Sequence, residues 1–289
     1  MKKIKYLVLV IVLMIFMTGC SLFKRDNMEN INIITTIYPL EYITNYLYGD
    51  SSVVNSIYPD DINTDTYKLT EKQLKDNSQK DLFIYMGLAN DSDIAVELIN
   101  RNKNLKLIDA TFGMEYKQDI SELWLNPSNL LMILQNIKNG LNEYIDNVYL
   151  KQEIEDKFIE LKMILSEVDA NLKTTMENAN NKTIYTNSKS LLFLEKYGIK
   201  VIVVDKESEL YEKNLALFKE ACENDKVKNF FVLEDSKTSD EVDKVINDEK
   251  INEIEFRNIK NITDEERNAK KNYVNLMDIN IENLKKELY

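Results

Sequence analysis

The chain contains no histidine, and this absence argues against several functional classes at once. Without an imidazole there is no Ser–His–Asp triad, no histidine general base and no histidine ligand for a metal ion. No Gly-rich phosphate-binding loop occurs either. Paired acids such as Asp60-Asp61 more often cap helices or face solvent than act as acid and base. The sequence therefore predicts that the protein is not an enzyme and holds no resident cofactor.

Cysteine, glycine and proline are also scarce. Six glycines and three prolines in 289 residues, with 44% hydrophobic and 30% charged residues, indicate a globular chain rich in regular structure. This length fits one large domain or two lobes that each bury a core. Of the two cysteines, Cys222 lies in an apolar helical pattern with Leu215 and Phe218, which predicts a small buried side chain.

The N-terminus has the pattern of a lipoprotein signal peptide. Three lysines within the first five residues precede an apolar run, residues 6–17, that is short for a membrane span, and Thr18-Gly19 leads into Cys20. We interpret residues 1–19 as the signal peptide, Cys20 as the lipidated residue and residues 20–30 as a tether. Met17 replaces the usual leucine of the motif. A signal anchor with an incidental cysteine is the alternative.

This interpretation predicts an extracytoplasmic protein held at the cell membrane by the lipid on Cys20. Lipidation of Cys20 would leave Cys222 alone, so no intramolecular disulfide is expected. Removing residues 1–19 leaves 34 basic and 49 acidic residues, a formal charge of −15. Such a charge argues against nucleic acid as a partner.

From residue 31 onward, short β-rich runs alternate with helical stretches, and the alternation occurs twice. The predicted strands are residues 31–35, 53–58, 82–86, 105–108, 183–186, 200–204, 230–233 and 251–256, with the first helices at 40–49, 71–79 and 91–102. Strands that alternate with helices form parallel sheets covered on both faces. The predicted fold class is α/β, with two lobes of mostly parallel sheet.

Two longer helical patterns separate the halves. The first covers residues 128–145 and the second 151–176, where apolar side chains recur every three or four residues. A helix of that length is about 37 Å long and can run the height of both lobes. We therefore predict an N-terminal lobe at 31–127, linking helices at 128–180 and a C-terminal lobe at 181–289. A coiled-coil partner for the long helix is the alternative.

The last segment begins with a capping box, Thr263-Asp264-Glu265-Glu266, and continues with apolar residues at helical spacing through Leu288. It predicts a terminal helix docked on a core.

Several segments resemble the solute-binding lipoproteins of zinc and manganese ABC importers, and they occur in that family's order. They are TIYPL at 36–40, DLFIYMGL at 81–88, WLNP at 124–127, KYGI at 196–199 and TDEER at 263–267, followed by Tyr273 and Met277. The resemblance covers nearly all of residues 31–288. It implies two α/β lobes joined by a rigid long helix, a metal ion held between them by three histidines and a carboxylate, and delivery to a permease and an ATPase.

Carried onto this chain, the resemblance places the four ligand positions on Asp65, Glu122, Asn187 and Arg257. A shift in register along the last strand would bring Glu255 to the same face as Arg257. A cation at ~4 Å from a guanidinium is repelled by about 4 kcal/mol per unit charge at an effective dielectric near 20. Tight zinc binding of the family type is therefore not expected, and no metal ligand is assigned.

Three interpretations of this altered cleft stay open. A hard cation could bind weakly through Asp65, Glu122, Asn187 and Glu255, whose oxygens suit calcium or manganese. Arg257 could instead bridge to Asp65 or Glu122, so that a salt bridge pins the lobes of an accessory or adhesive surface protein. An organic ligand could place its carboxylate on Arg257 and an ammonium group on the acids. Beside these stands a fourth case, in which the positions are solvated surface residues that diverged after loss of function.

Overall fold

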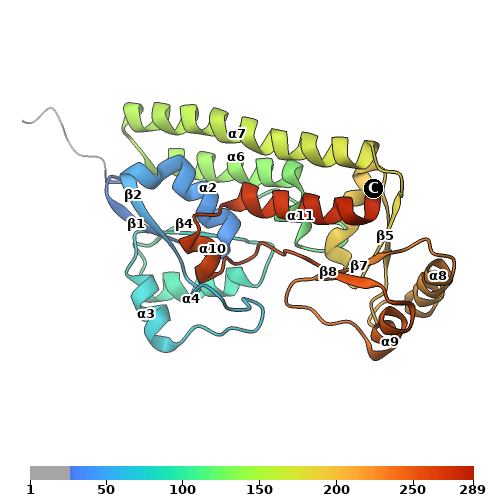
Figure 1. Ribbon diagram of the computed structural model, residues 1–289. Coiled ribbons are helices and arrows are strands. Elements are labelled where there is room, and N and C mark those ends of the chain that lie inside the picture. The colour runs from blue at the N-terminus through green and yellow to red at the C-terminus, as the bar shows by residue number, and fades with distance from the viewer. Residues whose placement is uncertain (1–26) are drawn as a thin grey trace, which may run out of the picture.

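The computed structural model describes residues 27–289, which form two separate β-sheets spanned by long helices (Figure 1). The predicted signal peptide, the lipobox and Cys20 lie outside the described residues. Met28 is fully buried and its carbonyl accepts a hydrogen bond of 2.9 Å from the Tyr48 hydroxyl. The end of the segment predicted as a tether therefore belongs to the folded part. Within residues 27–289, none of the helices combines the length and the apolar character that crossing a bilayer requires.

Each sheet has four strands, and every pairing is parallel. The first has the order β2-β1-β3-β4 and the second the order β6-β5-β7-β8. The strands are β1 (Ile31–Thr35), β2 (Ser52–Ser56), β3 (Leu82–Tyr85), β4 (Lys106–Asp109), β5 (Thr183–Thr186), β6 (Lys200–Val203), β7 (Asn229–Leu233) and β8 (Asn252–Phe256). The predicted fold class is confirmed, and each predicted strand lies within two residues of the observed one.

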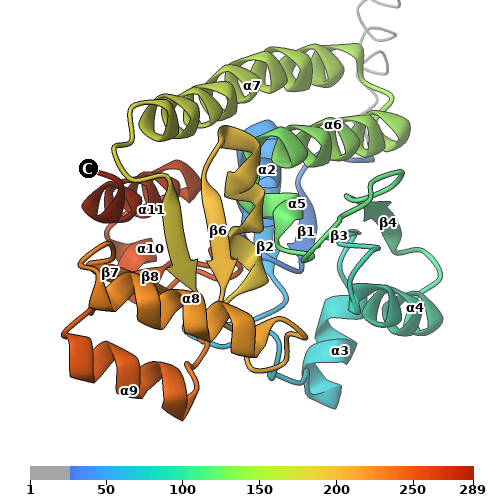
Figure 2. The ribbon, with the colours of Figure 1, turned by 90° about the vertical axis from the view of Figure 1, so that its right-hand side faces the viewer.

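Helices connect the strands and cover both faces of each sheet (Figure 2). They are α2 (Tyr38–Tyr48), α3 (Glu71–Ser78), α4 (Asp91–Arg101), α5 (Glu122–Leu125), α6 (Pro127–Tyr144), α7 (Val148–Glu177), α8 (Tyr211–Glu223), α9 (Asp240–Glu249), α10 (Asp264–Asn268) and α11 (Tyr273–Leu288), with 3₁₀ helices η2 (Gly49–Ser51) and η3 (Lys189–Tyr197).

The apolar core has three parts because side chains alternate across each sheet. Ile33 of β1 and Phe231 of β7 join one large cluster that extends over both sheets and the long helices. Their neighbours face the other way: Ile34 packs in a cluster under α3 and α4, and Phe230 in a cluster under α8 and α9. The two lobes thus share one core on their common side and keep separate cores on their outer sides.

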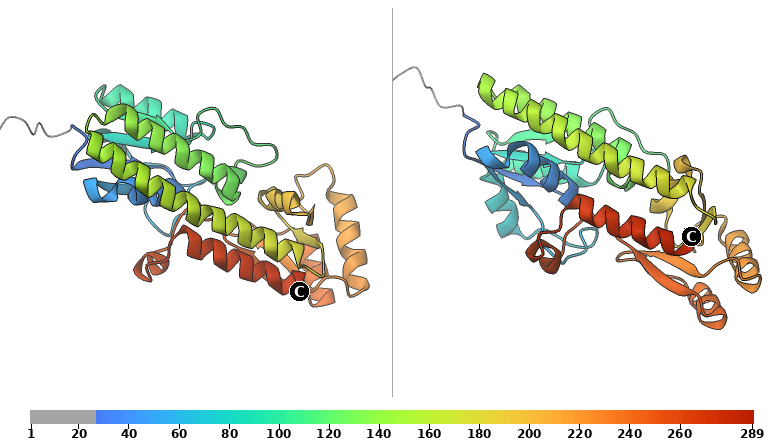
Figure 3. Two further views of the ribbon diagram at one scale, coloured as in Figure 1. Left: turned by 90° about the horizontal axis from the view of Figure 1, so that it is seen from above. Right: turned by 45° about the horizontal axis from the view of Figure 1, so that its top comes forward.

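Helix α7 runs along both lobes, with α6 and α11 beside it (Figure 3). Its 30 residues bury one stripe, which consists of Ile154, Phe158, Leu161, Leu165, Val168, Leu172 and Met176. The helix starts three residues before the predicted Lys151, because the Asn147 side chain accepts a hydrogen bond from the Tyr149 amide and caps an earlier turn. The stripe predicted from spacing is therefore buried within the chain itself.

The C-terminal segment forms two helices, α10 and α11, where the sequence predicted one terminal helix. Lys270 has φ of 56°, which ends the first helix, and Asn272 forms a second capping box with Asn275 that begins the next. The apolar repeat from Tyr273 onward docks on the shared core as predicted. Cys222 is buried in α8, and this burial raises the pKa of its thiol to about 12.

Truncation of the stripe on α7 tests this assignment. Leu165→Ala should lower the free energy of unfolding by ~2–5 kcal/mol, because Leu165 is completely buried in the core cluster that both lobes share. Met163→Ala, on the exposed side of the same helix, should change it by less than about 0.5 kcal/mol. Denaturant titration measures both, and equal losses would contradict the burial of this stripe.

Candidate functional site

The chain crosses between the lobes after β8, and residues 258–272 form what we call the crossover segment. The Tyr38 amide donates a hydrogen bond of 3.0 Å to the carbonyl of Lys260, and the indole nitrogen of Trp124 donates one of 2.8 Å to the carbonyl of Asn258. The Tyr273 hydroxyl, just beyond the segment, donates one of 2.6 Å to the carbonyl of Trp124. The crossover segment is therefore fastened to helices of the N-terminal lobe, although its place in the sequence is within the predicted C-terminal lobe.

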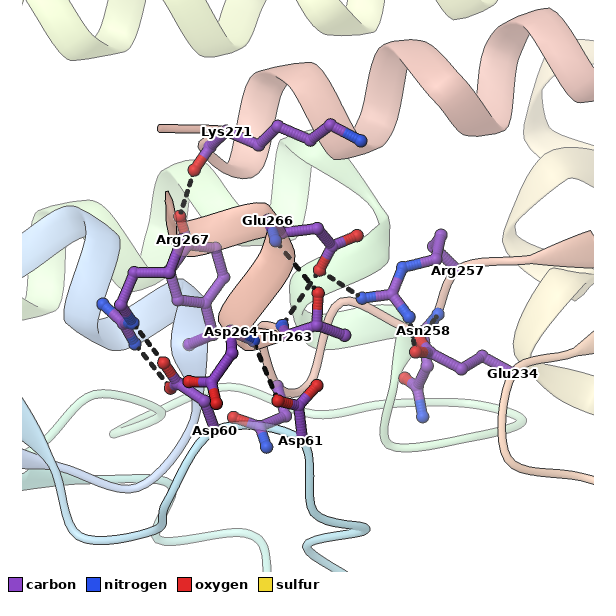
Figure 4. Close-up of polar contacts among 12 residues, drawn as sticks. Asp60, Asp61, Glu234, Arg257, Asn258, Thr263, Asp264, Glu266, Arg267 and Lys271 are labelled. Atoms are coloured by element: carbon purple, nitrogen blue, oxygen red, sulfur yellow. Dashed lines mark hydrogen bonds and ion pairs between the residues drawn. The ribbon is translucent and has the colours of Figure 1, made fainter. Parts of the chain in front are cut away.

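Arg257 stands at the start of this crossing and binds two acids (Figure 4). Its guanidinium is paired with Glu234, which follows β7, and it donates a hydrogen bond of 2.8 Å to Glu266 of α10. All three side chains are at most 17% exposed. Burial lowers the pKa of Arg257, and the carboxylate of Glu266 opposes that change. The trio joins the end of the second sheet to a helix that contacts the N-terminal lobe.

Helix α10 is held on the N-terminal lobe by a second arginine (Figure 4). Arg267 pairs with Glu41 of α2 at 2.7 Å and also with Asp60, which follows β2. These two carboxylates hold the pKa of Arg267 above its usual range. The amide of Asp264 donates a further hydrogen bond of 3.0 Å to Asp61. The predicted capping box between Thr263 and Glu266 is present, with Glu266 serving both the cap and Arg257.

Asp65, the first predicted ligand position, is paired with Lys260 of the crossover segment. Its side chain is 65% exposed, whereas that of Lys260 is 22% exposed. Asp65 and Lys260 line two cavities, one of about 130 Å³ that Arg257 also lines and one of about 730 Å³ inside the N-terminal lobe. The pair therefore lies at the rim where the lobes meet.

Glu122 and Asn187 are occupied by contacts with their own surroundings. The buried carboxylate of Glu122 accepts hydrogen bonds of 2.9 to 3.4 Å from the amides of residues 117–119, so it holds that loop. Asn187 accepts from the Leu233 amide at 2.9 Å and donates to Ser236 at 2.7 Å, which ties the end of β5 to the loop after β7. Neither residue lines the cavities at the rim.

Of the four predicted positions, the structure brings only Asp65 and Arg257 to a common cavity. The salt bridge from Arg257 to Asp65 or Glu122 is not formed, because Glu234 and Glu266 are its partners. Sequence reasoning missed Lys260 and Glu234, which are loop residues without a periodic pattern. Glu266 was recognised as a cap but not as an ion-pair partner. Across residues 27–289, no group of three or more His, Cys, Asp or Glu side chains is placed to hold a metal ion.

The buried trio around Arg257 makes a testable contribution to stability. Arg257→Met should cost ~3 kcal/mol or more in the free energy of unfolding, because two largely buried carboxylates lose their cation. Adding Glu266→Gln should recover part of the loss, since glutamine keeps the cap without the charge. Denaturant titration measures each variant.

Arg101 supplies the matched control, because it also binds two acids, Glu71 and Glu97, but near solvent. Arg101→Met should leave the free energy of unfolding nearly unchanged. An equal effect of Arg101→Met and Arg257→Met would contradict the importance of burial at the crossing.

Comparison with known proteins places this geometry in a family. A family model described as zinc-uptake complex component A, periplasmic, matches residues 33–287. The zinc-binding lipoprotein AdcA of Streptococcus pneumoniae strain R6 is 24% identical over an alignment of 310 positions that includes 99% of this chain. The chain spans about 61% of that relative's length. The substrate-binding lipoprotein ScbA of a metal ABC transporter of Streptococcus cristatus is 26% identical over 161 residues, covering 50% of this chain and 52% of ScbA.

Solved structures agree on the fold. The Zn(II)-bound ZnuA-like domain of AdcA from Streptococcus pneumoniae superposes with a TM-score of 0.73 at 20% identity, covering 90% of this chain and 99% of that one. The metal-dependent lipoprotein YcdH of Bacillus subtilis reaches 0.75 at 20% identity, with 90% and 99% covered. The laminin-binding protein Lbp of Streptococcus pyogenes reaches 0.71 at 15% identity, with 90% and 100% covered. With the family model matching from the first strand to the last helix, the chain belongs to the zinc-uptake component A family of metal-type ABC importer solute-binding proteins.

Proposed function

We propose that this protein is the lipid-anchored, extracytoplasmic solute receptor of an ABC importer, and that its interlobe site does not hold zinc in the family manner. The observation that carries the second part is the ion pair of Asp65 with Lys260. At the rim between the lobes, a side chain of the protein itself supplies the positive charge that a metal ion would otherwise bring. The role is one of binding, without catalysis.

The charges at this rim disfavour a divalent ion on physical grounds. An ion that approached Asp65 would meet the ammonium of Lys260, and two unit charges ~4 Å apart interact by about 4 kcal/mol at an effective dielectric of 20. The double charge of the ion increases this repulsion. Glu122 and Asn187 already satisfy backbone and side-chain partners, so they offer few free lone pairs. The residues present therefore do not fit a tight zinc site.

The import role is supported by the family membership and by the predicted lipobox at Cys20. The relatives that share this fold include proteins named as zinc-binding and metal-dependent lipoproteins. In this proposal a permease and an ATPase are the partners, and the lipid on Cys20 keeps the receptor beside them at the membrane. Neighbouring reading frames that encode such a pair would favour this role.

A surface role without transport is the second candidate function. The ion pairs that connect the two lobes favour it. Arg257, Arg267 and Lys260 hold the crossover segment with acids from both lobes, so the lobes are held together by the chain's own charges. A relative of the same fold is named a laminin-binding protein. An isolated gene without transport partners would favour this accessory or adhesive role.

Elemental analysis of the full-length protein in detergent tests the proposal. After exposure to zinc or manganese and desalting, the protein should retain no stoichiometric metal, and neither ion should shift its melting temperature. Lys260→Gln should strengthen weak manganese binding by about tenfold, because it removes the cation beside Asp65.

Lys75→Gln makes the same change of charge on exposed α3, away from both cavities, and should have no such effect. A tight one-to-one zinc complex of the unmodified protein would overturn the proposal.

A further inference from the structure

The larger cavity lies where an α/β sheet offers a ligand site. In the first sheet the chain order reverses between β1 and β3, which are neighbours. The cavity is lined by residues that lie within two positions of the carboxyl ends of three strands: Ile37 after β1, Tyr58 after β2 and Met86 after β3. Crevices at such switch points are the usual binding sites of open parallel sheets. At about 730 Å³, this one is large enough for a small organic molecule.

The lining of this cavity combines aromatic rings with an excess of acid. Four aromatic side chains line it, namely Tyr58, Tyr67, Tyr116 and Trp124. The rings of Tyr58 and Tyr67 stand edge to face with their centroids 6.0 Å apart. Four acidic and two basic side chains also line it, which leaves two net negative charges. Aromatic rings beside carboxylates are the surroundings that bind organic cations.

Among the acids that line this cavity, Asp91 is the one that a nearby cation would stabilise most. It begins α4, is half-buried and accepts a long hydrogen bond of 3.4 Å from the Met86 amide. It forms no ion pair with any residue between 27 and 289, whereas Lys260 at the mouth is already paired with Asp65. Burial raises the pKa of Asp91, and hydrogen bonds from Thr36 and Met86 together with the charge of Lys260 only partly oppose this rise. A ligand cation beside Asp91 would stabilise the carboxylate more than the present surroundings do.

The spacing of the acids decides between a metal ion and an organic cation. A metal ion needs several oxygen ligands within ~2.6 Å of one point. The acids of this cavity form no group of three that could meet that demand within the described part of the chain. An amine with a carbon skeleton spans several ångströms, so its ammonium can reach Asp91 while its apolar part contacts the rings.

From these observations we infer that the cavity at the first sheet binds a small organic amine in its positively charged form. The ammonium group would lie beside the carboxylate of Asp91, and the carbon skeleton would contact the rings of Tyr58 and Tyr67. The inference rests on the proposed role of the protein as a solute receptor and names the class of its solute. Asp65 and Lys260 remain paired at the mouth, where both also line the smaller cavity beside Arg257.

Calorimetric titration of the full-length protein in detergent with tyramine, putrescine and choline tests this inference. At least one of these amines should bind with a Kd below about 1 mM. The uncharged analogue of tyramine, 4-ethylphenol, should bind at least about tenfold more weakly than tyramine if tyramine is the one that binds. Asp91→Asn should weaken amine binding by about tenfold or more, because the amide keeps the hydrogen bond but not the charge.

Asp76→Asn is the matched control, since Asp76 is exposed on α3 outside the cavity and its loss should leave amine binding unchanged. If circular dichroism shows that the Asp91→Asn protein does not fold, Tyr58→Leu provides a second test, because removal of this ring should also weaken amine binding. Failure of all three amines to bind with a Kd below about 1 mM, or full affinity in a folded Asp91→Asn protein, would overturn the inference.

A parallel zinc titration distinguishes this inference from the proposed function. Zinc binding refutes the proposed function, whereas failure of both amines and zinc to bind refutes only the choice of solute.

Discussion

The guanidinium of Arg257 sits between two carboxylates at the point where the chain leaves one lobe for the other, and the arrangement of the lobes depends on it. Glu234 directly follows a strand of the second sheet, and Glu266 belongs to a helix fastened on the N-terminal lobe. Three largely desolvated charges are stable only together, because removal of one leaves the others unpaired in a poorly solvated place. This contact therefore favours one geometry of the crossing over others that would separate the charges.

The same principle extends along the crossover segment. Arg267 meets Glu41 and Asp60, and Lys260 meets Asp65, so two basic side chains of this segment are matched by acids of the N-terminal lobe. In a receptor that closes on a metal ion, the ion supplies the positive charge between the lobes. In this protein, lysine and arginine side chains of the chain itself supply that positive charge. In the proposed role as a receptor, a solute would bind beside these pairs, in the aromatic cavity that Asp65 and Lys260 also line.

Most of the fold could be predicted from the sequence, because it depends on local patterns. The apolar runs at β1 and β5 have the observed bounds, and the stripe of α7 follows from its spacing of three and four residues. The differences arose at caps and breaks. Asn147 starts α7 early, and Lys270 and Asn272 divide the last segment into two helices. Such boundaries depend on single side chains and dihedral angles, which periodicity does not record.

The sequence by itself determined the class of fold and the absence of imidazole ligands. The placement of the family's ligand positions on Asp65, Glu122, Asn187 and Arg257 is a prediction from the resemblance. Tertiary structure alone decided the partner of each of those side chains. Asp65 and Lys260 are 195 residues apart, and Glu234 precedes Arg257 by one helix and one strand. Pairing of charges is decided by distance in space and by burial, and both arise only when the two sheets, the long helices and the crossover segment pack together.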